Sequence, residues 1–337
     1  MGDIALKLIY NVGILFLMMV PGVILKKCRL STDGLGKGIS NLVLYVAQPA
    51  LIFLAYIRSF DLVILINSAY ILIFSAMAHT IFAIVALSLF KRSPDNMRRM
   101  LRFATIFSNA AFMGIPLISA VLGDEATIYA SVYNITFNLF LWSLGVYICT
   151  DDRDEDGDGV TDGDVYTDYH EVNKKKKSQA SLTKALLHPV TIAAALGLLF
   201  FLFPIEGYIP SILNDGLVML KNLVAPLSMV VIGLRLADID FRGVFKDKDM
   251  YIFLVLRHFL LPIVVMLIMQ LIMLTGLKID KTVFSVIIIM AATPAASSAT
   301  MLAEKFDCDA TYASKLVAIS TVLSIATMPV VVMLSGI

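Results

Sequence analysis

Long apolar segments recur along the whole chain, and they constrain its fold more than any other feature. Of the 337 residues, 59% are hydrophobic and 16% are charged, whereas soluble domains carry about 25% charged residues. An apolar run of about 18 residues makes a helix long enough to cross a bilayer, and the alternating pattern of a transmembrane barrel is missing. The sequence therefore predicts an all-α, polytopic protein surrounded by the lipid bilayer. Its formal net charge of +1 gives no reason to expect a nucleic-acid partner.

Ten transmembrane helices account for the apolar segments. Their predicted bounds are roughly 4–25, 38–57, 62–90, 99–121, 125–149, 187–204, 210–234, 250–276, 280–303 and 309–335. The first segment has no basic region before it and no small-residue cleavage site after it, so we interpret it as a spanning helix and not as a signal peptide. The three cysteines match no metal-binding spacing and give no disulfide framework.

Basic residues predict the orientation in the membrane. They gather after the first, third, fifth and seventh helices, at Lys26, Lys27, Arg29 and Lys37, at Lys91, Arg92, Arg98, Arg99 and Arg102, at Lys174, Lys175, Lys176 and Lys177, and at Arg242, Lys246 and Lys248. The loops on the other side carry fewer positive charges. Because cytoplasmic loops are enriched in lysine and arginine, we expect a multi-pass protein of the cell membrane with both termini outside and the long central loop in the cytoplasm.

Two sequence matches indicate an internal duplication. In QPALIFLAYIRSFD, Arg58 follows Pro49 by nine residues, and in APLSMVVIGLRLAD, Arg235 follows Pro226 by the same distance. In addition, GDEATIYAS (123–131) resembles CDATYAS (308–314). Because five helices is an odd number, the second copy would enter the membrane upside down, as in the inverted repeats of secondary transporters. The predicted division is a first five-helix repeat at 1–149, a cytoplasmic acidic and basic linker at 150–186, and a second repeat at 187–337.

Helices 4 and 9 carry residues that oppose a continuous helix. Proline removes a backbone hydrogen bond and clashes with the preceding turn, so SNAAFMGIPL predicts a break near Gly114 and a new half-helix from Pro116. In MAATPAASSATML, Thr293 suits a helix N-cap and Pro294 suits the first helical position. Two half-helix N-termini at mid-membrane would attract an anion. The alternative is a pair of proline kinks whose small residues only pack.

Polar residues near these breaks are candidates for binding an anion. Asn109, Thr293 and Ser297 belong to the two broken helices, while Gln48 and Asn134 lie in helices 2 and 5; the two amides would serve equally well in packing between helices. His79 is a candidate for coupling to protons, because an ionisable group inside the membrane is often functional, with a structural histidine as the alternative. Arg58 and Arg235 lie at helix ends and are expected to anchor and to pair with Asp61 and Asp238. Arg257 and His258 lie near one end of helix 8 and are expected to snorkel or pair.

At these residues the chain resembles the auxin efflux carrier family of secondary transporters, which includes bacterial and archaeal permeases. The matching segments are NAAFMGIPL, GDEA and YNITFNLFLW in the first half, and TPAAS and DATYASKLVAISTVLSIATMPVV in the second. The resemblance implies ten helices in two inverted five-helix repeats, with helices 4 and 9 crossing at the substrate site and one bundle moving against the other. It also implies small organic anions as substrates, such as auxin-like or dicarboxylate acids, with Asn109, Pro116 and Pro294 at the crossover.

The central loop contains an acidic stretch, DDRDEDGDGVTDGD. Asp154, Asp156, Asp158 and Asp162 have the alternating spacing with which oxygen ligands surround Ca²⁺, but Val165 stands where a calcium loop needs its bidentate acid. The stretch is therefore either a solvated acidic linker or a weak Ca²⁺ or Mg²⁺ site.

The predicted function is a secondary transporter that moves a small organic anion, with H⁺ or Na⁺ as possible coupling ions and no cofactor required. Two alternatives remain open. One is an anion channel or a transporter-like sensor on the same fold; the other is a membrane prenyltransferase, for which DDRDE at 151–155 would hold Mg²⁺–diphosphate. The absence of the common nucleotide-binding and hydrolase motifs argues against an enzyme. A homodimer is compatible with the sequence but is not predicted by it.

Overall fold

The structure of the chain is a computed structural model that describes residues 2–32, 34–150, 187–203, 209–238, 247–306 and 308–336. Within these ranges it is helical and has no strand longer than an isolated bridge. The elements, with η marking a π-helical turn, are α1 (Gly2–Leu17), α2 (Val20–Lys27), α3 (Leu35–Leu42), η1 (Val43–Ala47), α4 (Gln48–Tyr56), α5 (Leu62–Ser88), α6 (Asp95–Ile106), η2 (Ala110–Gly114), α7 (Ile115–Leu122), α8 (Asp124–Phe140), η3 (Leu141–Gly145), α9 (Val146–Thr150), α11 (Pro189–Leu202), α12 (Ser211–Asn222), α13 (Val224–Ala237), α14 (Lys248–Val255), η7 (Leu256–Leu260), α15 (Leu261–Leu274), α16 (Lys281–Ala292), α17 (Ser298–Lys305) and α18 (Ala310–Leu334).

Seven helical segments of the described chain are long and apolar enough to cross a membrane. They are Ile9–Lys27, Leu35–Tyr56, Leu62–Ser88, Asp124–Thr150, Ser211–Ala237, Lys248–Leu274 and Ala310–Leu334. Three shorter apolar helices, Ala110–Leu122, Pro189–Leu202 and Lys281–Ala292, fall where the sequence places its fourth, sixth and ninth spans. Within the described residues the predicted helical fold with several potential membrane-spanning helices is confirmed, while the count of ten membrane crossings stays a prediction. The aspartates proposed as metal ligands, Asp154, Asp156, Asp158 and Asp162, lie outside the described residues.

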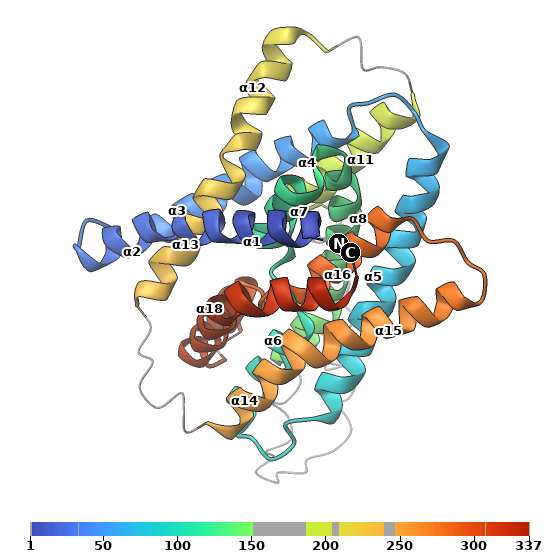
Figure 1. Ribbon diagram of the computed structural model, residues 1–337. Helices are drawn as coiled ribbons and strands as arrows, with labels where there is room; N and C mark the ends of the chain where they lie inside the picture. Colours follow the sequence, from blue (N-terminus) through green and yellow to red (C-terminus); the bar gives the residue numbers. More distant parts are fainter. Residues whose placement is uncertain are drawn as a thin grey trace, which may run out of the picture.

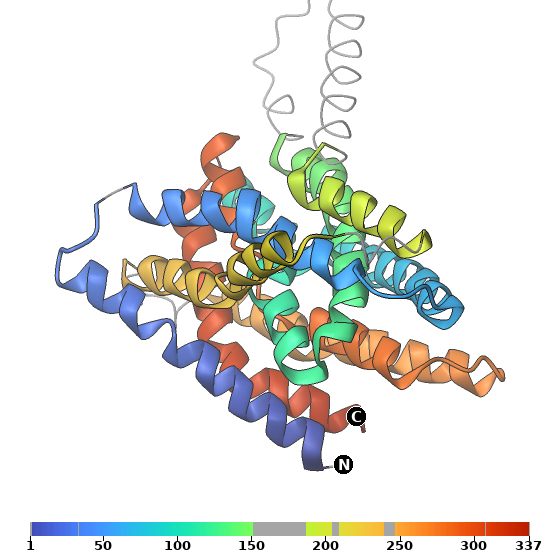
Figure 2. The same cartoon turned by 90° about the horizontal axis from the view of Figure 1, so that it is seen from above.

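The helices pack in two groups. In one group, α2 and α3 pack on α13, and α4 packs on α11 and α12. In the other, α5, α6, α7 and α8 pack together with α15, α16 and α18. Helix α1 contacts α13 of the first group and also lies against α7 and α18 of the second. The groups touch again where α4 lies against α8. In Figures 1 and 2 the first turn of α1 lies beside the last turn of α18, although these turns stand at opposite ends of the chain.

Prolines explain three of the π-helical turns. Pro49, Pro116 and Pro262 each stand two residues after a π turn, at Val43–Ala47, Ala110–Gly114 and Leu256–Leu260 respectively. Because proline has no N–H and its ring clashes with the carbonyl group four residues earlier, the helix widens or bends just before it. Pro226, the predicted counterpart of Pro49, likewise follows the interruption between α12 and α13. Each of these four prolines therefore follows an irregularity in its helix.

Two glycines let α2 and α13 approach each other closely. A methyl group added at Gly22 would overlap the carbonyl oxygen of Val230, and one added at Gly233 would overlap that of Met19. The clashing atoms belong to backbone, which cannot move aside as a flexible side chain can. Small residues of this kind allow close helix packing inside a membrane, so Gly22 and Gly233 fix the spacing within the first group.

Candidate functional site

Two interrupted segments meet in the middle of the second group of helices. The chain leaves the helical conformation at residues 107–109, between α6 and η2, and again at residues 293–297, between α16 and α17. The two stretches run antiparallel at Ser108 and Ala295. The Asn109 N–H donates to the Pro294 carbonyl at 2.7 Å, and the Ala296 N–H donates to the Phe107 carbonyl at 2.9 Å. Each interruption thus satisfies part of the other's exposed backbone.

The interruptions do not fall at the predicted residues. The expected break near Gly114 is wrong, because the π turn before Pro116 keeps the chain helical from Ala110 to Leu122. The expected N-cap role of Thr293 is also wrong. Thr293 is the C-cap residue that follows α16, and its hydroxyl donates to the Met290 carbonyl at 2.8 Å. Pro294 is not the first residue of the next helix, which begins at Ser298.

A buried arginine binds the carbonyl ends of both half-helices. Arg257, on η7, donates from Nη2 to the carbonyls of Thr293 at 2.8 Å and Ala291 at 3.1 Å, and from Nη1 to that of Thr105 at 3.2 Å. Its Nε also donates to Thr293 at 3.2 Å. The sequence interpretation, in which Arg257 lies near a helix end and snorkels or pairs, is wrong, since its side chain is 0% exposed. Its hydrogen bonds satisfy carbonyl groups that have no partner within their own helices.

The neighbouring residue His258 is also buried and reaches the same place. Its Nε2 lies 3.0 Å from Ser320 Oγ, which accepts a hydrogen bond from the Ala295 N–H at 2.9 Å. Its Nδ1 lies 2.8 Å from Thr327 Oγ1. The backbone of the second interruption is therefore connected to α18 as well as to η7.

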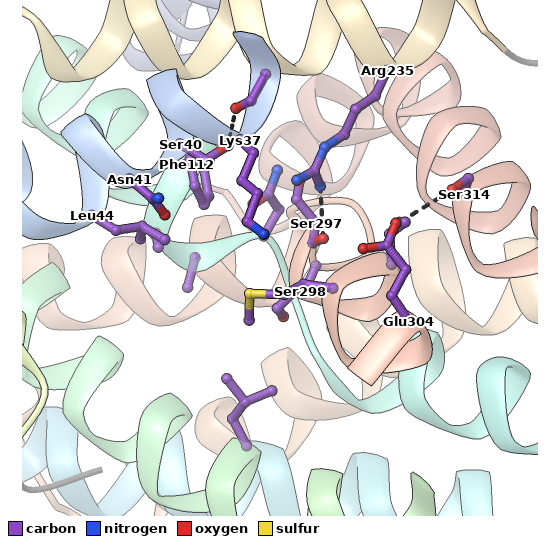
Figure 3. Close-up of a pocket in the computed structure, with 18 of the residues that line it drawn as sticks. Lys37, Ser40, Asn41, Leu44, Phe112, Arg235, Ser297, Ser298, Glu304 and Ser314 are labelled. Carbon is purple, nitrogen blue, oxygen red and sulfur yellow. Dashed lines mark hydrogen bonds between the residues drawn. The ribbon is translucent and has the colours of Figure 1, made fainter. Parts of the chain in front are cut away.

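A cavity of about 920 Å³ opens beside the interruptions, on the side where the second half-helices begin. Its lining includes Asn109 and Ala110 from the first interruption and Ser297 and Ser298 from the second. Figure 3 shows Ser297 and Ser298 facing this space, opposite Phe112 and Asn41. The half-helix N-termini lie here without side-chain caps, because neither Asn109 nor Ser297 caps the helix it precedes.

Several polar atoms at this cavity are buried and have no hydrogen-bond partner among the described residues. Four of them, on residues predicted as binding residues, are Gln48 Oε1, Asn109 Nδ2, Asn134 Oδ1 and Ser297 Oγ. The four side chains that carry them are at most 4% exposed. A buried polar group without a partner costs about 1–3 kcal/mol, so these atoms are suited to bind a polar ligand or water.

Positive charge predominates around the cavity. Its lining includes five cationic side chains, Lys26, Lys37, Arg235, Lys305 and Lys315, and two carboxylates, Asp238 and Glu304. Arg235 donates to the Ser297 carbonyl at 2.8 Å, while Asp238 pairs with Lys26 at 3.1 Å. The expected pairing of Arg235 with Asp238 is thus replaced by contacts that connect α13 to the second interruption and to α2.

The structure brings four of the predicted residues to the cavity, namely Gln48, Asn109, Asn134 and Ser297. Pro116, Thr293 and Pro294 are not among the described lining residues, although the carbonyls of Thr293 and Pro294 hold the two interruptions together.

His79 lies on α5, faces α8 and is not among the described lining residues, although its ring contacts Phe137, which lines the cavity. Its Nδ1 is 2.7 Å from the Ser75 carbonyl, and its ring packs against those of Tyr133, Phe137 and Phe140.

Sequence analysis did not identify Arg235, Lys305 or Arg257 as site residues. Arg257 stood out only as a charge within an apolar segment, a signal that a functional assignment could have used.

Comparison with known proteins places almost the whole chain in one group. A family model described as membrane transport protein matches residues 8–332. The chain is also 25% identical over 315 residues to an uncharacterized transporter of the archaeon Methanothermobacter thermautotrophicus, and the match covers 93% of each chain.

Proposed function

The chain belongs to the membrane transport protein family, the auxin efflux carrier family that its sequence resembles, and on this premise we propose that it carries a small organic anion by alternating access. Family membership makes the protein a membrane transporter and confirms the prediction that it is not an enzyme. Its several apolar helices make it a multi-pass membrane protein. The class of substrate and the transport mechanism are what we propose.

One observation carries the choice of an anion: two uncapped half-helix N-termini face one cavity whose charged side chains are mainly cationic. A helix N-terminus carries about half a positive charge and exposes free N–H groups. Asn109 Nδ2 and Ser297 Oγ are among the buried polar atoms at these two ends that have no partner in the described part of the chain. We assign the carboxylate of the substrate to this point, with Gln48 and Asn134 contacting the remainder of the molecule.

We also propose that the transporter has ten membrane-spanning segments in two inverted repeats. Three features support this arrangement. The start of α1 lies beside the end of α18 (Figure 2), as an even number of crossings requires. The interrupted segments meet in antiparallel orientation. Finally, Asp124 and Asp309 begin the helix that follows each interrupted segment, as the sequence match between the two halves predicts.

The cavity supports a form that is open to the cytoplasm. Its lining includes residues at the end of α2, the start of α3, the end of α13 and the start of α18. Basic residues in the sequence assign these ends to the cytoplasmic side. A second form, open to the outside, would complete alternating access by movement of one helix group against the other.

The proposal is tested with purified protein in two steps. A thermal-shift screen against small mono- and dicarboxylates, with and without Na⁺ and at two pH values, identifies a ligand and its coupling ion. Uptake by proteoliposomes then distinguishes a carrier, which saturates and shows counterflow, from an anion channel, which does neither. Stabilisation by amines but not by carboxylates would refute the choice of an anion.

A further inference from the structure

We propose that Arg257 is a positioning residue that holds the two interrupted segments together and makes their cavity side electropositive. The half-helices come from distant parts of the chain, and one guanidinium group bonds to carbonyls of both. The functional consequence rests on the proposed anion site, whereas the structural role is independent of it.

The first support is the distribution of the hydrogen bonds. Four N–H···O bonds run from Arg257 to three carbonyls, of which Thr105 belongs to α6 and Ala291 and Thr293 belong to the end of α16. A guanidinium presents several donors in a rigid plane, whereas a lysine ammonium is a compact point charge. Arginine therefore fixes the distance between the two helix ends in a way that lysine does not.

The second support is the balance of charge. Arg257 is fully buried, and none of the ion pairs among the described residues includes it. Each helix C-terminus carries about half a negative charge, so the ends of α6 and α16 together match one cation. The Phe82 ring, 5.2 Å from the guanidinium carbon, adds a cation–π contact. Because Arg257 neutralises the partial negative charges at the two helix C-termini, the partial positive charges of the half-helix N-termini at Asn109 and Ser297 make the electrostatic potential of the cavity more positive.

The third support is the local structure that carries Arg257. It lies on the π turn that precedes Pro262, and such turns often occur at functional sites. The next residue, His258, reaches the Ala295 N–H through Ser320. Arg257 thus contacts carbonyl groups at the helix ends that precede both interruptions. His258, on the same turn, reaches an N–H group of the second interruption through the Ser320 hydroxyl.

Hydrogen exchange of the full-length protein, followed by mass spectrometry, tests this role without a substrate. The reporters are peptides that contain the Asn109 and Ala296 amides, which bond across the two interruptions. Arg257→Lys keeps the charge but loses the fork of donors. We expect both peptides to exchange faster together, by about tenfold, the factor that corresponds to about 1.4 kcal/mol. Arg257→Gln should show a larger increase.

Arg58 provides the matched control, because within the described part of the chain it donates to one backbone carbonyl, that of Ala55, at 3.1 Å. Arg58→Lys should leave both peptides unchanged. If both peptides of Arg257→Lys exchanged at the rate of the parent protein, the proposal would be overturned. A faster exchange rate in only one of the two peptides would overturn it as well. If Arg257→Gln yields no folded protein, the lysine variant alone decides.

Binding measurements separate this proposal from the proposed function. If a carboxylate binds the parent protein, Arg257→Lys should weaken it together with the faster exchange. If no carboxylate binds the parent, the proposed substrate class fails while the exchange results still decide the role of Arg257.

Discussion

Asn109→Ala should weaken substrate binding without lowering stability, and this combination separates a binding residue from a packing residue. Asn109 Nδ2 is buried and has no partner among the described residues, and the side chain makes no capping hydrogen bond. Removing such a group costs no hydrogen bond and relieves a desolvation penalty of about 1–3 kcal/mol. We therefore expect the melting temperature of the variant to equal or exceed that of the parent.

Binding should change in the opposite direction. A hydrogen bond to a charged group contributes about 1.5–3 kcal/mol, so losing the amide should raise the Kd for a carboxylate roughly 10- to 150-fold. The assay is a thermal-shift titration, with calorimetry for the carboxylate that binds best. It measures both quantities on one preparation.

Asn67→Ala is the matched control for the loss of a buried amide. Asn67 Nδ2 donates to the Tyr129 hydroxyl at 3.3 Å, and Asn67 is not among the described lining residues. Its loss should lower the melting temperature and leave Kd unchanged. If Asn109→Ala bound the carboxylate with the Kd of the parent protein, Asn109 would not be a binding residue. A fall in its melting temperature like that of Asn67→Ala would refute the assignment too.

Three further variants test other parts of the structure. Gly233→Ala should destabilise the protein by about 1–3 kcal/mol, seen as a lower melting temperature, because its methyl group would meet the Met19 carbonyl; an unchanged temperature would refute the close contact of α2 and α13. Arg235→Gln should raise the Kd of an anion most at low ionic strength, since salt screens its charge; a loss independent of salt would indicate a purely structural role through its bond to Ser297. His79→Gln should preserve the pH profile of uptake, because the imidazole packs among the aromatic rings of α8 and is not itself among the described lining residues; a flattened profile would instead make His79 the proton carrier.

The sequence predicted which segments are interrupted but not where. Asn109, Gly114 and Pro116 oppose a regular helix in any context, so an irregularity in the fourth segment follows from local chemistry. Its position depends on a partner far along the chain, because the bonds to Pro294 and Ala296 stabilise the non-helical backbone at 107–109. Local patterns do not contain that information.

The partners of the Arg257 side chain could not be predicted from local sequence patterns either. An arginine inside an apolar segment is expected to reach for the membrane surface when only its own helix is considered. Its actual partners are carbonyl groups at Thr105, Ala291 and Thr293, which other segments leave unpaired. By contrast, Asn109 and Ser297 were recognised as candidates because they flank the interruptions themselves, and they line the cavity beside them.

The proximity of the first turn of α1 to the last turn of α18 bears on how the two halves are ordered along the chain. A short peptide joining these turns, with the chain opened between residues 150 and 187, would give a circular permutant in which the second half is translated before the first. Circular permutation succeeds where the joined ends are close and the new ends are exposed. If such a permutant folds and transports, the helix contacts of the two groups determine the packing, and the order of synthesis does not.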